Sequence, residues 1–199
     1  MNQNDNVPAS AAPEKGCYGY RDAHRRRSLI ISAVLLCLTV GLTLTGRHLS
    51  GVPGTVLTIS GILFVLPFAN VLSPLLTMLS VRTPGREQYD AVRRFSDRGE
   101  LLYDLTFTSK EGVMPADAAL IRPELCVLLC PALKDAPSKL TSFLAERLNM
   151  EDIHVDLYLY TDTEAFVKAL DSLDVPAEGS RGEDDTVRRI RIVFLSLSY

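Results

Sequence analysis

The sequence predicts an α/β protein of the α+β kind, in which a two-helix transmembrane hairpin precedes a small mixed-sheet domain with helices. Two long stretches without a charged residue, 28–45 and 49–81, predict the hairpin. A hydrocarbon layer about 30 Å thick needs about 20 apolar residues of helix, and each stretch supplies them. Residues 86–199 have the composition of a globular domain and the usual length of an independently folding unit.

Residues 1–27 are expected to form a disordered basic cytoplasmic tail. Asn, Pro, Ala and Ser dominate its first part, and large aliphatic side chains are rare there. The first span is expected at about residues 28–46. A cleaved secretory signal is disfavoured, because a long polar segment precedes the stretch and no small-x-small cleavage site follows it.

The second span is expected at about residues 56–79, because the preceding letters SGVPGT are rich in turn-forming residues. Pro67 and Pro74 each remove a backbone hydrogen bond from this helix. We therefore expect a kink near Phe64 or Val71.

Small residues in both spans offer surfaces for close helix contact, and these are Gly41, Gly46, Ser60 and Gly61. Their spacing is too loose for a dimerisation motif, and a homo-oligomer through the spans stays an open alternative. A transporter would require such an oligomer, because two helices cannot enclose a polar path.

The distribution of basic residues predicts the orientation of the hairpin. Five Lys or Arg residues lie before the first stretch, one lies in the connection, and five follow the second stretch closely. The positive-inside rule then places both termini in the cytoplasm. Cys17, Cys126 and Cys130 would face a reducing compartment, where a disulfide framework is not expected.

The first half of the domain predicts a helix and three strands. Apolar residues recur at helical spacing in REQYDAVRRFSDRG. Strands follow at residues 101–107 and 113–121, joined by the turn SKEG, and Pro115 favours an edge position or a bulge. The apolar run LCVLLC predicts a third strand that is covered on both faces.

The second half predicts helices alternating with strands. A helix is expected near Asp135, with Pro137 in its first turn. The strand 153–160 alternates apolar with polar residues. Thr161 and Glu164 have the spacing of a capping box that opens another helix.

After the acidic linker AEGSRGEDD, residues 189–197 are expected to form the last strand. Short turns predict antiparallel pairing of the early strands, and two strand-helix-strand crossovers predict parallel pairing of the later ones.

The charge of the domain limits its partners. Residues 101–199 contain ten Lys or Arg against seventeen Asp or Glu, a net charge of −7, whereas the whole chain has −3. Nucleic acid is an unfavourable partner, because its binding depends on Lys and Arg. The sequence favours the lipid bilayer as the surroundings of the hairpin and a protein as the partner of the domain.

Few residues are candidates for chemistry. His154 and Asp156 share the polar face of their strand and could act as a general base and its orienting group, or could be solvated sheet surface. Cys126 and Cys130 have no second Cys or His pair at zinc spacing, so we interpret them as packed thiols. No cofactor or metal is expected, and the sequence favours a role without catalysis.

The order of helix, three strands, helix and strand in residues 86–160 resembles the restriction-endonuclease-like arrangement. That resemblance implies an acidic residue on the second strand and a Glu-x-Lys on the third, which together hold a metal beside the scissile phosphate. Asp117 and Glu124 match these positions, but Cys126 stands where the family has lysine. A membrane-tethered, degenerate nuclease or hydrolase using Asp117 and Glu124 is therefore the alternative function.

The basic tail, the hairpin with FVLPFAN and the stretch LYDLTFTSKEGVMPADAALIR are similar to a group of small uncharacterised membrane proteins of Gram-positive bacteria. This similarity implies a bacterial plasma membrane and no particular chemistry. The expected role is to tether an acidic cytosolic domain for protein interaction or regulation.

Overall fold

The computed structural model describes residues 13–49, 51–78, 81, 83–109, 112–133, 137–175 and 185–198. The chain divides into two compact units, one made of the residues up to Arg21 together with those from Thr83 onward, and the other of Asp22–Arg82. Several expected features lie outside the described residues: the first twelve residues of the tail, the centre of the SKEG turn, the helix start near Asp135, and most of the acidic linker.

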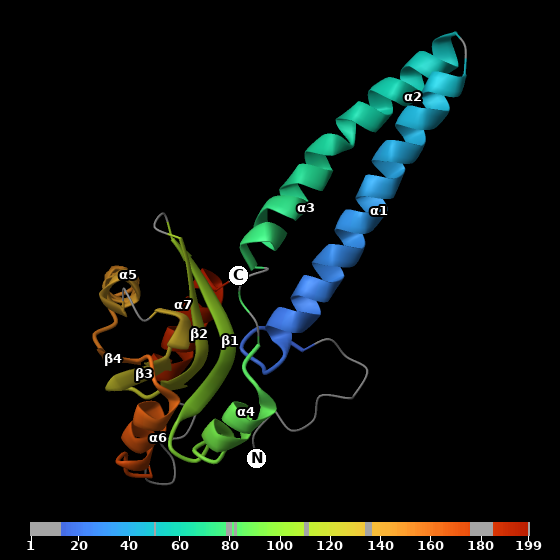
Figure 1. The fold of residues 1–199 in the computed structure, drawn as a ribbon. Coiled ribbons are helices and arrows are strands. Elements are labelled where there is room, and N and C mark those ends of the chain that lie inside the picture. The colour runs from blue at the N-terminus through green and yellow to red at the C-terminus, as the bar shows by residue number, and fades with distance from the viewer. Residues whose placement is uncertain are drawn as a thin grey trace. The chain divides into compact units, whose positions relative to one another are not determined.

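The hairpin consists of α1 (Tyr20–His48), α2 (Val52–Leu63) and α3 (Val65–Met78), as Figure 1 shows. In the part of the chain that the structure describes, two helical segments are long and apolar enough to cross a membrane, namely α1 and Val52–Ser73. The helices expose many large apolar side chains, and these include Ile30, Val56, Ile62 and Leu66. An apolar surface of this kind is typical of a protein segment that contacts lipid or another apolar partner.

The second helical segment begins at Val52, four residues before the expected start. Pro53 explains the difference, because proline is well tolerated in the first turn of a helix, where its missing N–H has no partner to lose. The helix is interrupted at Phe64, one of the two places where a kink is expected, since α2 ends at Leu63 and α3 begins at Val65. The helix α3 continues without a break past Val71.

The two arms of the hairpin approach each other closely at glycines. A Cβ atom added at Gly61 would lie 2.4 Å from Thr43 Oγ1, and one added at Gly46 would lie 2.4 Å from Thr58 Oγ1. Both separations are shorter than any real Cβ contact, so these contacts require glycine. Gly41 has nothing within 4 Å of the same position and takes no part in this contact.

The domain contains a four-stranded sheet in the order β1-β2-β3-β4. The strands are β1 (Glu100–Ser109), β2 (Gly112–Ile121), β3 (Leu125–Leu129) and β4 (Asp156–Tyr160). The pairs β1-β2 and β2-β3 are antiparallel and β3-β4 is parallel, which confirms the expected mixed sheet.

Helices cover both faces of this sheet (Figure 1). One core layer contains apolar side chains of α5 (Pro137–Met150) and α7 (Asp185–Leu197). The other contains side chains of α4 (Arg86–Arg93) and α6 (Thr163–Asp171). A short 3-10 turn, Pro131–Leu133, follows β3. The strand β3 is therefore covered on both faces, as its continuous apolar run predicts.

The prediction of a strand at residues 189–197 is wrong, because this segment belongs to the helix α7. Val187, Ile190 and Phe194 recur at helical spacing and are fully buried, while Ile192 is 56 % exposed. Burial of this helical face outweighs the strand preference of the β-branched residues, a preference that depends strongly on context. The second strand-helix-strand crossover is consequently absent from the described residues.

The expected tail also differs from the structure in its second half. The helix α1 begins at Tyr20 rather than near residue 28, and the segment before it packs on the sheet. Residues 13–27 are therefore folded. Polar contacts with distant parts of the chain hold the segment before α1 on the sheet. The local amino-acid composition cannot predict such contacts.

Two smaller predictions differ from the structure, namely the N-cap of α6 and the strand position of Pro115. The N-cap of α6 is Asp162, whose carboxylate accepts the N–H of Ala165, and not Thr161. Pro115 lies in β2, which is an inner strand, but the ladder between β2 and β3 starts only at Ala118. At Pro115, β2 pairs with β1 alone. Proline is tolerated where a strand has a neighbour on one side only.

We predict that Gly61→Ala destabilises the protein by about 1–3 kcal/mol, because the added methyl group overpacks a tight contact. Unfolding of the detergent-solubilised chain by a denaturing detergent measures the change. The matched control is Gly41→Ala, which adds the same methyl group in open space and should leave the transition unchanged or raise it slightly, because alanine favours a helix over glycine. Equal transitions for the two variants would contradict the proposed helix contact.

Candidate functional site

The strands β1 and β2 both change the face to which their side chains point, and they do so at the same level of the sheet. Tyr103 packs in the layer of α4 and α6, whereas Leu105 packs in the layer of α5 and α7. In β2, Ala118 packs in the layer of α4 and α6, whereas Ala116 packs in the layer of α5 and α7. Residues two apart in a strand normally share a face. The regular alternation is therefore broken in both strands at once.

Asp104 and Asp117 occupy the two positions of this break. The ladder pairs Tyr103 with Ala118 and Leu105 with Ala116, so the two aspartates stand opposite each other between these pairs. Asp104 has a φ of 54°, a backbone conformation that few residues other than glycine adopt. Like charges directly opposite each other across two strands are destabilising, so this arrangement requires a cation.

Arg21 supplies the cation from the first turn of α1. Only 2 % of this residue is exposed. Its Nη1 donates to Asp117 Oδ1 at 2.7 Å, and its Nη2 donates to the carbonyl oxygens of Leu105 at 2.6 Å and Ala116 at 2.7 Å. Its Nε donates to Thr106 Oγ1 at 3.2 Å. One planar guanidinium thus bonds to both strands at the level where their alternation is interrupted.

Asp104 is the second acid of the cluster, and its side chain is fully buried. Its Oδ2 accepts hydrogen bonds from the Gly19 N–H at 2.7 Å and from Thr83 Oγ1 at 3.1 Å. Its Oδ1 lies 3.9 Å from Arg21 Nη1 and has no hydrogen-bond partner among the described residues. Burial raises the pKa of Asp104 above its ordinary value, although the Arg21 charge and the hydrogen bonds from Gly19, Thr83 and the Arg21 backbone oppose the increase.

The cluster joins two segments that flank the hairpin in sequence. Gly19 and Arg21 precede most of α1, and Thr83 follows α3. Nearby, Tyr18 donates to the Pro84 carbonyl at 2.9 Å and stacks on Tyr89 with ring centroids 4.3 Å apart. The two segments are therefore held in one folded unit by contacts with each other and with β1.

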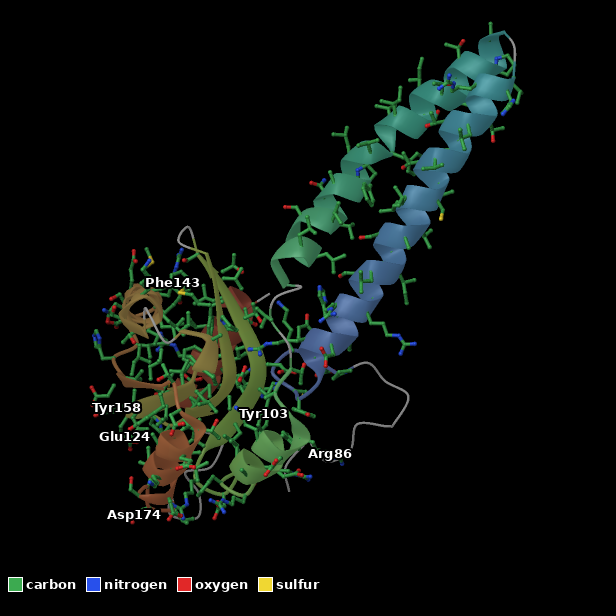
Figure 2. All side chains as sticks on the ribbon, in the orientation of Figure 1. Arg86, Tyr103, Glu124, Phe143, Tyr158 and Asp174 are labelled. Atoms are coloured by element: carbon green, nitrogen blue, oxygen red, sulfur yellow. The ribbon has the colours of Figure 1, made fainter. Side chains whose placement is uncertain are left out.

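The N-terminal segment also covers the edge of β1. The Gly16 carbonyl accepts the N–H of Tyr103, a residue labelled in Figure 2, at 2.7 Å. Lys15 Nζ donates to the carbonyl of Ser198, which forms an isolated bridge with Phe107 of β1. An exposed strand edge is a template for unwanted pairing, and these contacts occupy part of it.

The structure places Asp117 and Glu124 in different surroundings. The Asp117 carboxylate belongs to the Arg21 cluster in the middle of β2. Glu124, labelled in Figure 2, is exposed in the turn between β2 and β3, and its carbonyl accepts the N–H of Asp156. Cys126 is fully buried in the core layer of α5 and α7. The two carboxylates are therefore not brought together at one site.

His154 and Asp156 lie on the surface. His154 is exposed, and its ring nitrogens lie 3.2 Å from Asn149 Oδ1 and 3.7 Å from Asp152 Oδ1. Asp156 is exposed at the start of β4. Among the described residues, no group of three His, Cys, Asp or Glu side chains is arranged to hold a metal ion.

Sequence reasoning missed both Arg21 and Asp104. Arg21 was counted only as a basic residue beside the first span. The signal for the cluster is the spacing of the two aspartates, which stand five residues before Ser109 and five residues after Gly112. A hairpin centred on SKEG places them face to face, and that arrangement predicts a cation from elsewhere in the chain.

We predict that Arg21→Ala lowers the free energy of unfolding by about 3–5 kcal/mol, since it leaves buried carboxylates without their counterion. Thermal or denaturant unfolding of the detergent-solubilised chain measures the loss. Arg26→Ala, at an exposed position of α1, removes the same charge and should change the stability by less than about 0.5 kcal/mol. Comparable losses in the two variants would contradict a special role of Arg21.

The buried cysteines should be unreactive in the folded protein. Burial raises the pKa of Cys126 to about 12, and burial together with the Asp117 charge raises the pKa of Cys130 further. Since the thiolate is the reactive form, we expect neither to react with a maleimide at neutral pH until the chain unfolds. Mass spectrometry of the labelled protein checks this, with the partly exposed Cys17, which lies outside the hairpin, as the control. Rapid labelling of Cys126 before unfolding would refute the burial.

Comparisons of this chain with protein-family models, with curated proteins and with solved structures find no match. The similarity to small membrane proteins of Gram-positive bacteria and the restriction-endonuclease-like resemblance stay predictions. The functional interpretation of the buried cluster depends on its own contacts, in which one guanidinium and two carboxylates join the segments on either side of the hairpin.

Proposed function

We propose that this chain is a two-span integral membrane protein of a bacterial plasma membrane, with both termini in the cytoplasm. Its hairpin tethers the α+β domain to the inner face of the membrane, and the domain acts there by binding a protein partner. Two helices long and apolar enough to cross a membrane support the first part of this proposal.

The observation that carries the proposal is that the folded domain contains residues from both sides of the hairpin. Residues up to Arg21 and residues from Thr83 onward belong to one compact unit, and Asp22–Arg82 forms the other. Two parts of one folded unit must lie on the same side of a membrane. The intervening segment must therefore cross the membrane an even number of times, and its two apolar helical segments supply two crossings.

The positive charge on both sides of the hairpin supports a cytoplasmic location of the two flanking segments. Basic residues are concentrated before the first helix and after the second, and only Arg47 lies in the connection. Chains of this pattern keep their basic flanks in the cytoplasm. The hydrogen bonds at Asp104 support the same side for both flanks, because they join Gly19 and Thr83.

The charge of the domain supports a protein as the partner. Residues 101–199 carry a net charge of −7, which repels nucleic acid and anionic lipid. The Asp117 carboxylate is already bound to Arg21 and is not free to act as a metal ligand. A binding role is thus better supported than hydrolysis.

Topology mapping tests the proposal. We expect reporters fused before residue 13 and after Tyr199 to be cytoplasmic, and a single cysteine placed in the connection near Leu49 to be labelled from outside the cell. The chain should also stay in the membrane fraction after alkaline extraction. Termini on opposite sides, or release by alkali, would refute the proposed arrangement.

A further inference from the structure

The helical segment formed by α2 and α3 carries a seven-residue repeat on the face that contacts α1, beside which it runs in Figure 1. Four residues of this inner stripe recur every seven positions, and they are Gly54, Gly61, Phe68 and Leu75. Three of the four are buried, and the phenylalanine is half-buried. At Gly54 and Gly61 an added Cβ atom would collide with Gly46 and Thr43 of α1. A helix with such a repeat presents one continuous stripe to its partner, and for the inner stripe this partner is α1.

A second stripe with the same repeat lies on the opposite face of this segment. Its members follow each other at alternating steps of three and four positions, and they are Val56, Ile59, Leu63, Leu66, Asn70 and Ser73. Leu63 follows Gly61 by two positions, which is about 200° around the helix. The N–H groups of Phe64 and Phe68 donate to the carbonyl groups four residues before them, so the stripe continues across the break at Phe64. The four apolar members are 54 to 66 % exposed. This outer stripe is therefore a helix face of the kind that packs against another helix.

Asn70 places an amide in the outer stripe. Its side chain is exposed, and no hydrogen bond to that amide is present among the residues that the structure describes. The residue lies eight positions before the end of α3 at Met78, about 12 Å along the helix axis. Its backbone carbonyl also lacks the usual helical donor, because the residue four positions later is Pro74, which has no N–H. In the two-span arrangement proposed above, lipid tails can bond to neither group, so Asn70 requires a partner from another helix.

A second copy of the chain has the matching group by necessity. Copies inserted with the same topology hold Asn70 at the same depth, so a two-fold axis along the membrane normal brings the two side chains together. An amide has both donors and an acceptor, and two amides related by a two-fold axis can each donate to the other. In parallel helix pairs with a seven-residue repeat, equivalent core positions meet, and one asparagine there fixes the register. A different membrane protein would need a polar group at this same depth.

We propose that the outer stripe is the contact surface between two copies of this chain in the membrane, held in register by a hydrogen-bonded pair of Asn70 side chains. This inference rests on the two-span topology proposed above. The apolar members of the stripe contribute packing, for which lipid competes. The amide pair contributes the specificity, because lipid tails offer no hydrogen bond in its place. Each dimer carries two copies of the acidic domain, so a protein partner with two sites would bind it with increased avidity.

Disulfide formation between copies of the full chain in membranes tests the contact. Two variants carry Leu66→Cys or Val65→Cys, and in both the accessible thiols are removed by Cys17→Ser and Cys37→Ser. Leu66 belongs to the outer stripe. Val65 is one position away at nearly the same depth and outside the stripe, although it is 46 % exposed. After mild oxidation we expect a several-fold higher yield of the disulfide-linked dimer from Leu66→Cys. Equal yields, or a product of Leu66→Cys with another protein, would overturn the proposal.

Removal of the amide tests the role of Asn70. Fluorescent proteins fused after Tyr199 report the association of two copies by energy transfer in lipid vesicles, measured over a range of protein-to-lipid ratios. We expect Asn70→Leu to weaken the association by about three- to thirty-fold, the effect of losing interhelical hydrogen bonds of this kind. Asn70→Gln is the matched variant, since it keeps an amide at the position and should retain most of the association. Unchanged association in Asn70→Leu, or equal losses in the two variants, would refute the proposed pair.

Alkaline extraction of the same membranes separates this inference from the topology on which it rests. A chain that stays in the membrane and has Tyr199 on the cytoplasmic side, but gives neither the Leu66→Cys dimer nor energy transfer, overturns the dimer alone. A chain that alkali releases overturns the dimer and the two-span topology together. The cross-linking variants keep Asn70, so their result stands even if Asn70→Leu fails to fold.

Discussion

The domain depends on one ion cluster, in which the guanidinium of Arg21 lies between two strands that present facing aspartates. Without it, Asp104 and Asp117 would oppose each other across β1 and β2 with no cation. A buried ion pair gains little over an apolar replacement, but a buried charge that loses its partner is costly. The cluster therefore makes the first turn of α1 an indispensable support of the sheet.

The cluster also explains why the strands change faces where they do. Side chains on both strands switch core layers between Tyr103 and Leu105 and between Ala116 and Ala118. The switch turns two carbonyl groups toward the Nη2 atom of Arg21, which takes the place of regular cross-strand bonding at this level. Backbone groups that would otherwise be buried and unsatisfied are thereby paired.

Local patterns in the sequence predict much of the architecture. The charge-free stretches predict the hairpin, the proline at 67 predicts the break near Phe64, and LCVLLC predicts the inner strand β3. The antiparallel and parallel pairings also follow from connection length. The helix α7 was missed because alternating β-branched residues resemble a strand until the burial of Ile190 and Phe194 is known. Arg21 was missed for a related reason. Its hydrogen-bond partners are 84 to 96 positions away, and local composition carries no trace of them.

The position of Arg21 in the chain has a consequence for biosynthesis. In a membrane-inserted protein this residue is synthesised before both crossings, whereas its partner strands are synthesised after them. A chain whose start had been translocated could not deliver the guanidinium to the sheet, and its domain would be left with two uncompensated acids. Such a mis-inserted chain would be unstable and open to proteolysis. If the hairpin is inserted in a membrane, only chains with both flanks on one side would be able to complete the sheet.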